Sequence, residues 1–352
     1  MAVSKAVFVD NPSTNVFVNQ GVEASLLERV SEGETVLYVW TNDFAVVLGR
    51  NQNAYAECKV ELLESDGGLL ARRLSGGGAV FHDNDNLNFT FISKSSDFDK
   101  ERNFNVVQRA VESFGICVER NGRNDLTVNG AKFSGNAYYT KGDCKLHHGT
   151  LLLGTSKERV AKYLTPDQDK FTGKAVKSVS SRVCALDTYN SEINRESMVA
   201  ALEKAFAEEY AEAEFCRLAP FMLGADIVLK WTGFFGADEW RYGKKEDFDF
   251  RMKTELFGRP AVVALRIEND EIKTARIYTD ALESEKVCAV EETLCGVNLK
   301  AAAEGRIVRS GTEENGIHVE ADKTENGVED CSETTSAACA IASEAAKEWY
   351  EN

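Results

Sequence analysis

The segment from Asp125 to Ser134 reads Asp-Leu-Thr-Val-Asn-Gly-Ala-Lys-Phe-Ser. Its Asn129-Gly130 pair stands between two runs in which apolar and polar residues alternate. This pattern is a strong signal of a β-hairpin with a two-residue turn. The turn predicts four cross-strand pairs: Val128 with Ala131, Thr127 with Lys132, Leu126 with Phe133 and Asp125 with Ser134. Because cross-strand partners share a face, one side of the hairpin is expected to be apolar and the other polar.

The polar face of this hairpin is the expected site of chemistry. It would carry Asp125, Thr127, Lys132 and Ser134 side by side. A lysine in a strand is ordinarily a solvated surface residue, but glycines flank this one and a carboxylate lies across the ladder. A fixed ammonium can neutralise both a carboxylate nucleophile and an α-phosphate, whose mutual repulsion otherwise blocks adenylation. We therefore predict that Lys132 is catalytic.

A second polar segment, Arg72 to Asp83, contains three consecutive glycines before an apolar stretch. Gly76, Gly77 and Gly78 would let backbone N–H groups approach an anion without obstruction by side chains. Arg73 adds a planar group of donors suited to phosphate or carboxylate. A flexible turn beside a surface arginine pair is the alternative interpretation. The spacing is neither Gly-x-Gly-x-x-Gly nor that of a P-loop, so a Rossmann dinucleotide site is disfavoured.

The pattern of apolar residues predicts an α+β fold. Strands are expected at 36–40, 45–49 and 87–92, and helices from near Asp99 to before Gly115 and around Met198 to Phe206. Strands and helices are segregated and do not alternate as βαβ units, which favours a large domain with mixed sheets.

A second, smaller α+β domain is expected after residue 257. Apolar runs on either side of Asn269-Asp270 predict another hairpin, and the alanine-rich stretch from Thr335 to Tyr350 predicts a closing helix. Residues 311–336 have the composition of an acidic mobile loop. A chain of 352 residues favours two domains, which we place at 1–252 and 257–352.

The chain is acidic, with 41 Lys and Arg against 57 Asp and Glu and a net charge of −16. This charge opposes nonspecific binding to nucleic acid or to an anionic membrane. No apolar run approaches the ~18 residues of a membrane span, and the N-terminus lacks the apolar region of a signal peptide. Nine cysteines without CxxC spacing suggest free thiols in a reducing compartment, so a cytoplasmic location is expected.

Two further features limit the chemistry. His147 and His148 are adjacent, so on a strand they point to opposite faces and chelate poorly. No metal site made by the protein's own side chains is predicted; one histidine is expected to be structural and the other to lie near the site. Cys144 could accept an acyl group, but an unreactive cysteine is the more common case.

Several segments together resemble the lipoate–protein ligase and lipoyltransferase family, within the biotin and lipoate protein ligase superfamily. They keep the family's order over roughly the first half of the chain: 15–23, 40–53, 72–83, 86–91, 122–126, 130–138, 147–152 and 178–183. Residues 239–243 resemble the end of the family's large domain. The combination is specific, whereas no single segment is.

The resemblance implies a large α+β catalytic domain, related to biotin protein ligases, and a small accessory domain. It implies that ATP and Mg²⁺ convert lipoate to lipoyl-AMP. The lipoyl group would then pass to a lysine of the lipoyl domains of 2-oxoacid dehydrogenase acyltransferase subunits or of the glycine cleavage H protein. Lys132 would touch the acyl carbonyl and the phosphate, and Asp125 would orient it or help to hold the nucleotide. The other residues expected at the adenylate are Arg73, Ser75, Gly76, Gly77, Gly78, Ala79, Val80, Phe81, Ser134 and Ala137.

Several activities stay open from the sequence. A ligase activates free lipoate with ATP, a lipoyltransferase uses preformed lipoyl-AMP, and an octanoyltransferase uses a cysteine thioester without ATP. A noncatalytic acyl- or nucleotide-binding module would need no poised Lys132. The segment from Asn19 to Glu23, Asn-Gln-Gly-Val-Glu, departs from the family's usual Asn-Leu-Ala-x-Glu, which would alter the acyl tunnel.

Overall fold

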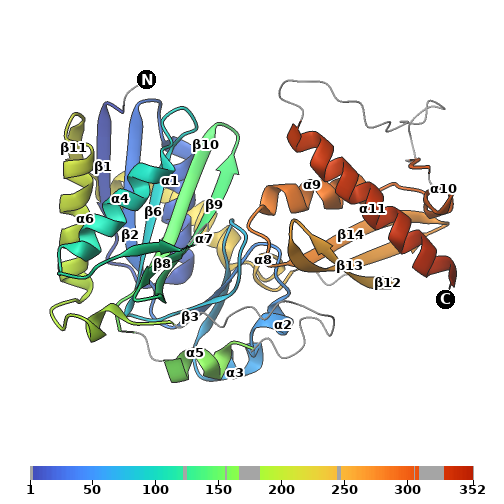
Figure 1. Cartoon of the computed structure of the whole chain (residues 1–352), viewed down its shortest axis with the longest axis horizontal. Helices are drawn as coiled ribbons and strands as arrows, with labels where there is room; N and C mark the ends of the chain where they lie inside the picture. Colours follow the sequence, from blue (N-terminus) through green and yellow to red (C-terminus); the bar gives the residue numbers. More distant parts are fainter. Residues whose placement is uncertain are drawn as a thin grey trace. The chain divides into compact units, whose positions relative to one another are not determined.

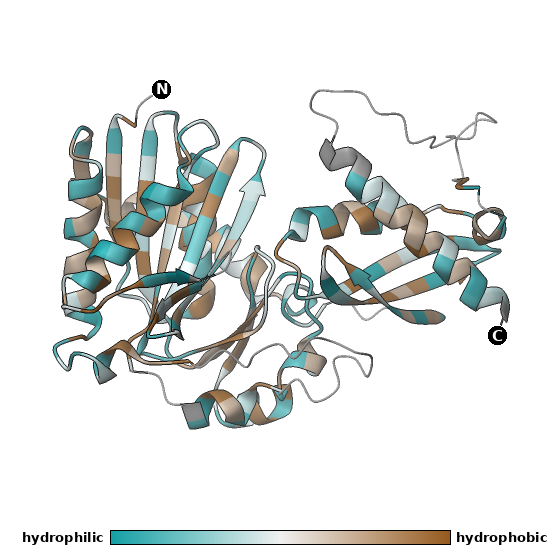
Figure 2. Ribbon diagram, viewed as in Figure 1, coloured by the Kyte–Doolittle hydropathy of each residue, from teal (hydrophilic) through white to brown (hydrophobic). Residues whose placement is uncertain are grey.

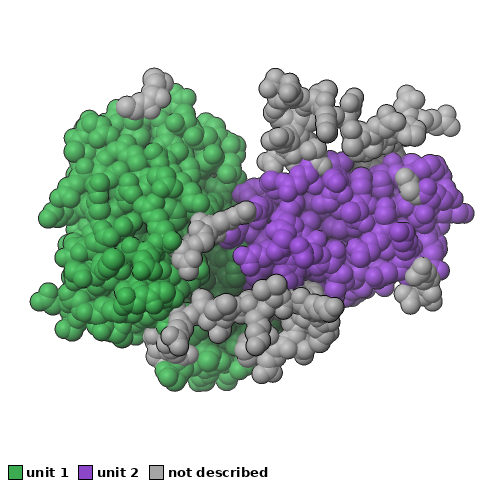
Figure 3. Space-filling model, viewed as in Figure 1, with its two compact units in different colours: residues 1–50, 54–243 green, residues 51–53, 244–352 purple. Residues whose placement is uncertain are grey.

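The computed structural model describes residues 3–121, 125–154, 157–165, 183–243, 247–304, 306–308 and 329–351. The chain forms two compact units, residues 1–50 with 54–243 and residues 51–53 with 244–352 (Figure 3). Some sequence-based expectations lie outside the described residues. These are the family-like segments at 122–124 and 178–182, and most of the acidic stretch at 311–336.

The first unit is built on an eight-stranded mixed sheet in the order β11-β1-β2-β6-β10-β9-β8-β7 (Figure 1). Its strands are β1 Lys5–Asp10, β2 Glu34–Thr41, β6 Asn86–Lys94, β7 Glu119–Asn121, β8 Asp125–Val128, β9 Ala131–Lys141, β10 Cys144–Leu152 and β11 Glu214–Arg217. A smaller sheet has the order β4-β3-β5, with β3 Ala45–Leu48, β4 Leu69–Arg72 and β5 Val80–His82. The strands predicted at 36–40 and 45–49 therefore lie in different sheets.

Helices cover both faces of the large sheet. The longer ones are α1 Val16–Arg29, α4 Lys100–Glu112, α6 Arg195–Glu209 and α7 Ala225–Gly236. The buried cluster of α4 and α6 includes Phe91 of β6, whereas α1 packs on the opposite face and α7 packs on α1. Short helices complete the unit: α2 Ala54–Glu57, α3 Val60–Ser65, α5 Lys157–Tyr163, α8 Asp238–Arg241, η1 Leu186–Thr188 and η2 Pro220–Leu223. Apolar and polar residues alternate along several strands (Figure 2).

The β8–β9 hairpin has the predicted turn but a different register beyond it. Asn129 and Gly130 both have positive φ, 51° and 71°, as a two-residue turn of this kind requires. The pairs Val128–Ala131 and Thr127–Lys132 form as predicted. The next two were wrong, because a bulge shifts the register so that Leu126 pairs with Ser134 and Asp125 with Gly135.

The bulge has a packing reason. It inserts Phe133 as an extra residue in β9, and Leu126, Phe133 and Val128 all enter one buried cluster. Ser134 is fully buried and accepts a hydrogen bond from Asn136 Nδ2 at 3.3 Å. It does not lie in the open polar row that the regular register predicts.

The second unit is a three-stranded antiparallel sheet with helices. Its elements are β12 Phe250–Leu256, β13 Arg259–Glu268, β14 Glu271–Thr279, α9 Ser284–Leu294, α10 Leu299–Ala303 and α11 Glu329–Glu351. The turn at Asn269 and Asp270 again has positive φ at both residues. The predicted α+β class is confirmed, but the expectation of no βαβ units was wrong: β1 and β2 pair in parallel across α1, and β3 and β4 pair in parallel across α2 and α3. The units divide at 243/244, so the expected limit at residue 252 falls inside β12. No described helix is long and apolar enough to cross a membrane.

Candidate active site

The glycine loop, residues 76–78, connects β4 to β5, the two strands that flank β3. Gly77 has φ of 92°, a conformation that side chains disfavour. Gly49, at the end of β3, approaches the loop so closely that an added Cβ would lie 1.9 Å from the Gly77 carbonyl oxygen. At Gly78 an added Cβ meets nothing within 4 Å. The loop is therefore packed on one side and open on the other.

The Arg73 guanidinium donates hydrogen bonds to backbone carbonyls of this loop. Its Nη2 donates to the carbonyls of Gly76 and Gly78 at 2.6 and 2.9 Å, and its Nη1 donates to Val47 O at 3.2 Å. Its Nε donates to Ser75 Oγ at 3.1 Å. Burial lowers the pKa of Arg73 from 12.5 to about 10, so the guanidinium stays charged at neutral pH. By binding the carbonyls of Gly76 and Gly78, the guanidinium fixes the backbone conformation of the loop and keeps these carbonyls from facing an anion.

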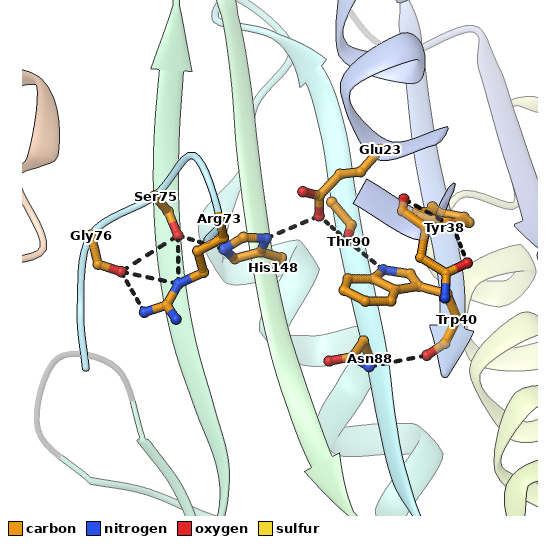
Figure 4. Close-up of polar contacts among 10 residues, drawn as sticks. Glu23, Tyr38, Trp40, Arg73, Ser75, Gly76, Asn88, Thr90 and His148 are labelled. Carbon is orange, nitrogen blue, oxygen red and sulfur yellow. Dashed lines mark hydrogen bonds and ion pairs between the residues drawn. The ribbon is translucent and has the colours of Figure 1, made fainter. Parts of the chain in front are cut away.

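A buried hydrogen-bonded chain connects the loop to the sheet and α1 (Figure 4). Ser75 Oγ lies 2.6 Å from His148 Nε2, and His148 Nδ1 lies 2.9 Å from Glu23 Oε1. Thr90 donates to the same Glu23 oxygen, and Trp40 Nε1 donates to Thr90. Because an ionised carboxylate only accepts, Nδ1 carries the proton, and in the neutral ring Nε2 accepts from Ser75. The chain therefore fixes the orientation of Ser75, which in turn contacts Arg73.

His82 is the second buried histidine near the loop. Asn42 accepts from Asn19 through its amide oxygen, so its Nδ2 donates to His82 Nδ1 at 3.0 Å. His82 Nε2 then carries the ring proton. Burial, assisted by the nearby Arg73 and His148, lowers the pKa of His82 from 6.5 to about 3. The ring is therefore a neutral donor at physiological pH.

Lys132 and Asp125 form an ion pair at 2.7 Å, with their side chains 30% and 36% exposed. The lysine stem crosses Gly135, where an added Cβ would lie 3.2 Å from both Lys132 Cε and Nζ. The bulge makes this possible, because it brings Gly135 opposite Asp125. The Lys132 carbonyl also accepts from Cys184 N at 2.9 Å, which ties β9 to the segment after residue 182. Lys132 and Asp125 are neighbours as predicted, although Asp125 pairs with Gly135 and not with Ser134.

The remaining predicted residues lie in three different environments. Ala137 is the cross-strand partner of His148 and so lies on the face that points to the loop. Ala79 and Val80 are partly buried after the glycines, and Phe81 is in the core of the smaller sheet. Ser134 is buried away from the open face, as described above.

The two adjacent histidines have the separate environments that strand geometry predicts. His147 is fully buried, lies 2.9 Å from Asn136 Oδ1 and stacks on Tyr138, and burial lowers its pKa well below its usual value. His148 faces the loop. Cys144 lies four residues before His148 on β10, roughly 13 Å along the strand. Its thiol is buried beside Lys94 and burial raises its pKa, so it lacks the environment of a reactive thiolate.

Sequence reasoning missed Glu23, Thr90, Trp40 and Asn42. Each is separated from its partners by many residues, and only tertiary packing brings them together. The available signal was the family resemblance, because all four residues lie in the matching segments 15–23, 40–53 and 86–91.

A surface depression of about 440 Å³ lies elsewhere on the first unit, lined by residues of β1, α6 and β11. It contains none of the predicted site residues. The candidate active site is therefore the glycine loop with the β8–β9 hairpin, which carry the cations and the backbone N–H groups suited to an anion.

Comparison with known proteins agrees with this geometry. A family described as the lipoyl protein ligase A/B catalytic domain matches residues 15–207. Lipoate-protein ligase A of Psychrobacter cryohalolentis is 34% identical over 291 residues, which cover 81% of this chain and 86% of the relative.

Two solved structures are similar to this one. LipL1 of P. falciparum in complex with lipoate matches with a TM-score of 0.72 and 28% identity, covering 82% of this chain and 89% of that one. A lipoate-protein ligase A bound with ATP matches with a TM-score of 0.58 and 22% identity, covering 69% of this chain and 99% of that one, and so shows a shared fold. The chain belongs to the lipoate-protein ligase family, as its sequence predicts.

Proposed function

We propose that this ligase joins lipoate to a lysine of acceptor lipoyl domains in two steps at the glycine loop and Lys132. In the first step a lipoate carboxylate oxygen attacks the α-phosphorus of ATP, which forms lipoyl-AMP and releases pyrophosphate. In the second step the acceptor amine attacks the acyl carbonyl, which forms the amide and releases AMP. The observation that carries the proposal is the Lys132 ammonium, which Asp125 holds at 2.7 Å over a glycine.

Lys132 would reduce the electrostatic repulsion between the two reacting groups. Carboxylate and α-phosphate are both anions, and bringing them together requires a cation fixed before the reaction begins. Asp125 restricts the lysine to one position, and Gly135 leaves the space that its stem occupies. The ammonium would contact the acyl oxygen and the phosphate together. Its attraction grows as the two groups approach, so it lowers the barrier more than it stabilises bound substrate.

The glycine loop would receive the phosphate through backbone N–H groups between Gly76 and Phe81. Arg73 supports this role by binding loop carbonyls, which turns them inward and leaves the side at Gly78 open. Ser75, fixed by His148, and Ala137 would complete the nucleotide and acyl surroundings, whereas the buried Ser134 would not contact the substrate.

Mg²⁺ would enter with the nucleotide. Among the described residues no group of three or more His, Cys, Asp or Glu is placed to hold a metal ion. Magnesium in such enzymes is usually held by substrate phosphates and waters with one or two carboxylates. We therefore assign no protein ligand set and derive no step from the metal.

The acceptors would be the lipoyl domains of 2-oxoacid dehydrogenase acyltransferase subunits and the glycine cleavage H protein. A structure of the same family pairs a bipartite ligase from Thermoplasma acidophilum with its E2 lipoyl domain. The free thiols of the described cysteines fit a reducing compartment, so we propose a cytoplasmic site of action.

Pyrophosphate exchange tests the proposal directly. Labelled pyrophosphate should enter ATP in the presence of lipoate alone, and an acceptor lipoyl domain should then become lipoylated. Transfer from supplied lipoyl-AMP without exchange would identify a lipoyltransferase instead. Transfer from an acyl thioester without ATP would identify the third alternative, which the buried Cys144 disfavours.

A further inference from the structure

Gln20 on α1 is a buried amide without a partner. The residue is 1% exposed, and neither its Nε2 nor its Oε1 has a hydrogen-bond partner in the part of the chain that the structure describes. Most buried side-chain polar groups in folded proteins are paired, and an unpaired one destabilises the fold. Such a group points to a ligand that is bound during function.

The position of Gln20 follows from its neighbours on one face of α1. Residues three or four apart on a helix share a face. Val16, four residues earlier, packs with Val47 and Ala71 of β3 and β4. Ala24, four residues later, packs with Leu74, the residue before Ser75. Gln20 therefore faces the layer beneath β3, β4 and the start of the glycine loop segment.

Glu23 is a second, independent indication of the direction in which this face of α1 points. It lies three residues after Gln20, and its carboxylate reaches His148, which contacts Ser75 of the loop segment (Figure 4). Gln20 is thus a buried, unpaired amide on the face of α1 that also contacts the segment leading into the loop that would hold the acyl-adenylate.

We propose that Gln20 faces the acyl chain of the substrate and selects a chain that carries a hydrogen-bond acceptor. The inference rests on the proposed function. The two ring sulfurs of lipoate are weak acceptors and can pair with the Gln20 N–H groups. The saturated tail of octanoate has no acceptor, so it would bury the same amide unpaired. A site that contains a buried donor rejects the analogue that cannot satisfy it.

Substitution by leucine tests this selection. We expect Gln20→Leu to lower the ratio of kcat/KM for lipoate to kcat/KM for octanoate by about twofold to tenfold, the factor that corresponds to one neutral hydrogen bond. The change should lie mainly in KM, because the contact exists before and during the reaction. Pyrophosphate exchange with each acid supplies both constants. Gln108→Leu, a change to a half-buried glutamine of α4 that donates to Glu112, should leave the ratio unchanged.

Stability supplies a second readout. Gln20→Leu should unfold at the same temperature as the parent or higher. Leucine removes a buried amide that has no hydrogen-bond partner, so no other polar group is left unsatisfied. Loss of the fold would show that the amide is structural and would overturn the inference. An unchanged acid ratio in a folded variant would also overturn it and leave the proposed function intact. Exchange with neither acid in the parent would instead overturn the proposed function itself.

Discussion

Removal of the Lys132 ammonium separates catalysis from stability more sharply than any other change in the site. Both side chains of its ion pair with Asp125 are about one-third exposed, and ion pairs of this kind contribute about 0–1 kcal/mol to folding. Lys132→Ala should therefore unfold close to the temperature of the parent. The apolar face of the hairpin, including Phe133, is unchanged.

The expected loss in rate is far larger. Removing one fixed electrostatic donor from a preorganised site typically costs about 2.7–4 kcal/mol, or 10²–10³-fold in rate. That energy is several times the stability of an exposed ion pair, so the two effects can be told apart. The double variant Lys132→Ala with Asp125→Asn should stay nearly as slow, because the missing attraction dominates over repulsion from the uncovered carboxylate.

The assay is pyrophosphate exchange with lipoate, measured beside thermal unfolding. Lys141→Ala is the matched control, since Lys141 lies on the same strand and forms a 2.9 Å ion pair with Glu28. It should lose little activity. Near-normal exchange by Lys132→Ala would refute the assignment, and so would an equal loss in the control.

Four other outcomes are expected. Gly78→Ala should weaken ATP binding about tenfold, or about 1.4 kcal/mol, because the added Cβ would occupy the open side of the loop. The variant should keep its stability, since this Cβ meets no protein atom within 4 Å. Gly233→Ala, at an equally open glycine, should not change the affinity in a titration with ATP. Cys144→Ser should keep most ligation activity; complete loss, with a thioester trapped on the parent, would favour the ATP-independent transferase. The free energy of unfolding should fall as pH drops from about 6.5 to 3, because the unfolded chain protonates His82 before the folded chain does, and His82→Gln should flatten this slope. Truncation after Gly243 should leave a folded first unit that transfers from lipoyl-AMP better than it activates lipoate; equal loss in both half-reactions would contradict a role for the second unit in activation.

The sequence predicted those elements whose signals are local. The Asn-Gly turn, the helix that begins after Asp99 and the turn at Asn269-Asp270 all depend on residues adjacent in the chain. The bulge in β9 was not predictable in the same way. Alternation alone places Phe133 opposite Leu126, and only the filling of the core decides that an extra residue is inserted there.

The candidate site shows the same division. Lys132 and Asp125 were predicted together because one hairpin carries both. The contacts that fix the loop join residues far apart in the chain: Ser75 and His148 have a sequence separation of 73, and Glu23 and His148 one of 125. No periodicity in the sequence connects them. Their proximity follows from the packing of α1 against β6 and β10, which tertiary structure alone determines.

The acidic net charge of the chain makes the local arrangement of cations decisive for substrate binding. A charge of −16 repels both ATP and lipoate at long range, but salt screens such a field beyond about 8–10 Å. Among the described residues of the candidate site, the groups that can attract an anion are Lys132, the loop N–H groups and the half-buried Arg73. Arg73 donates hydrogen bonds to the carbonyls of Gly76 and Gly78. Its effect on an anion therefore comes through its charge and through the conformation that it gives the loop. Affinity for the adenylate should therefore depend on loop geometry more than on surface charge.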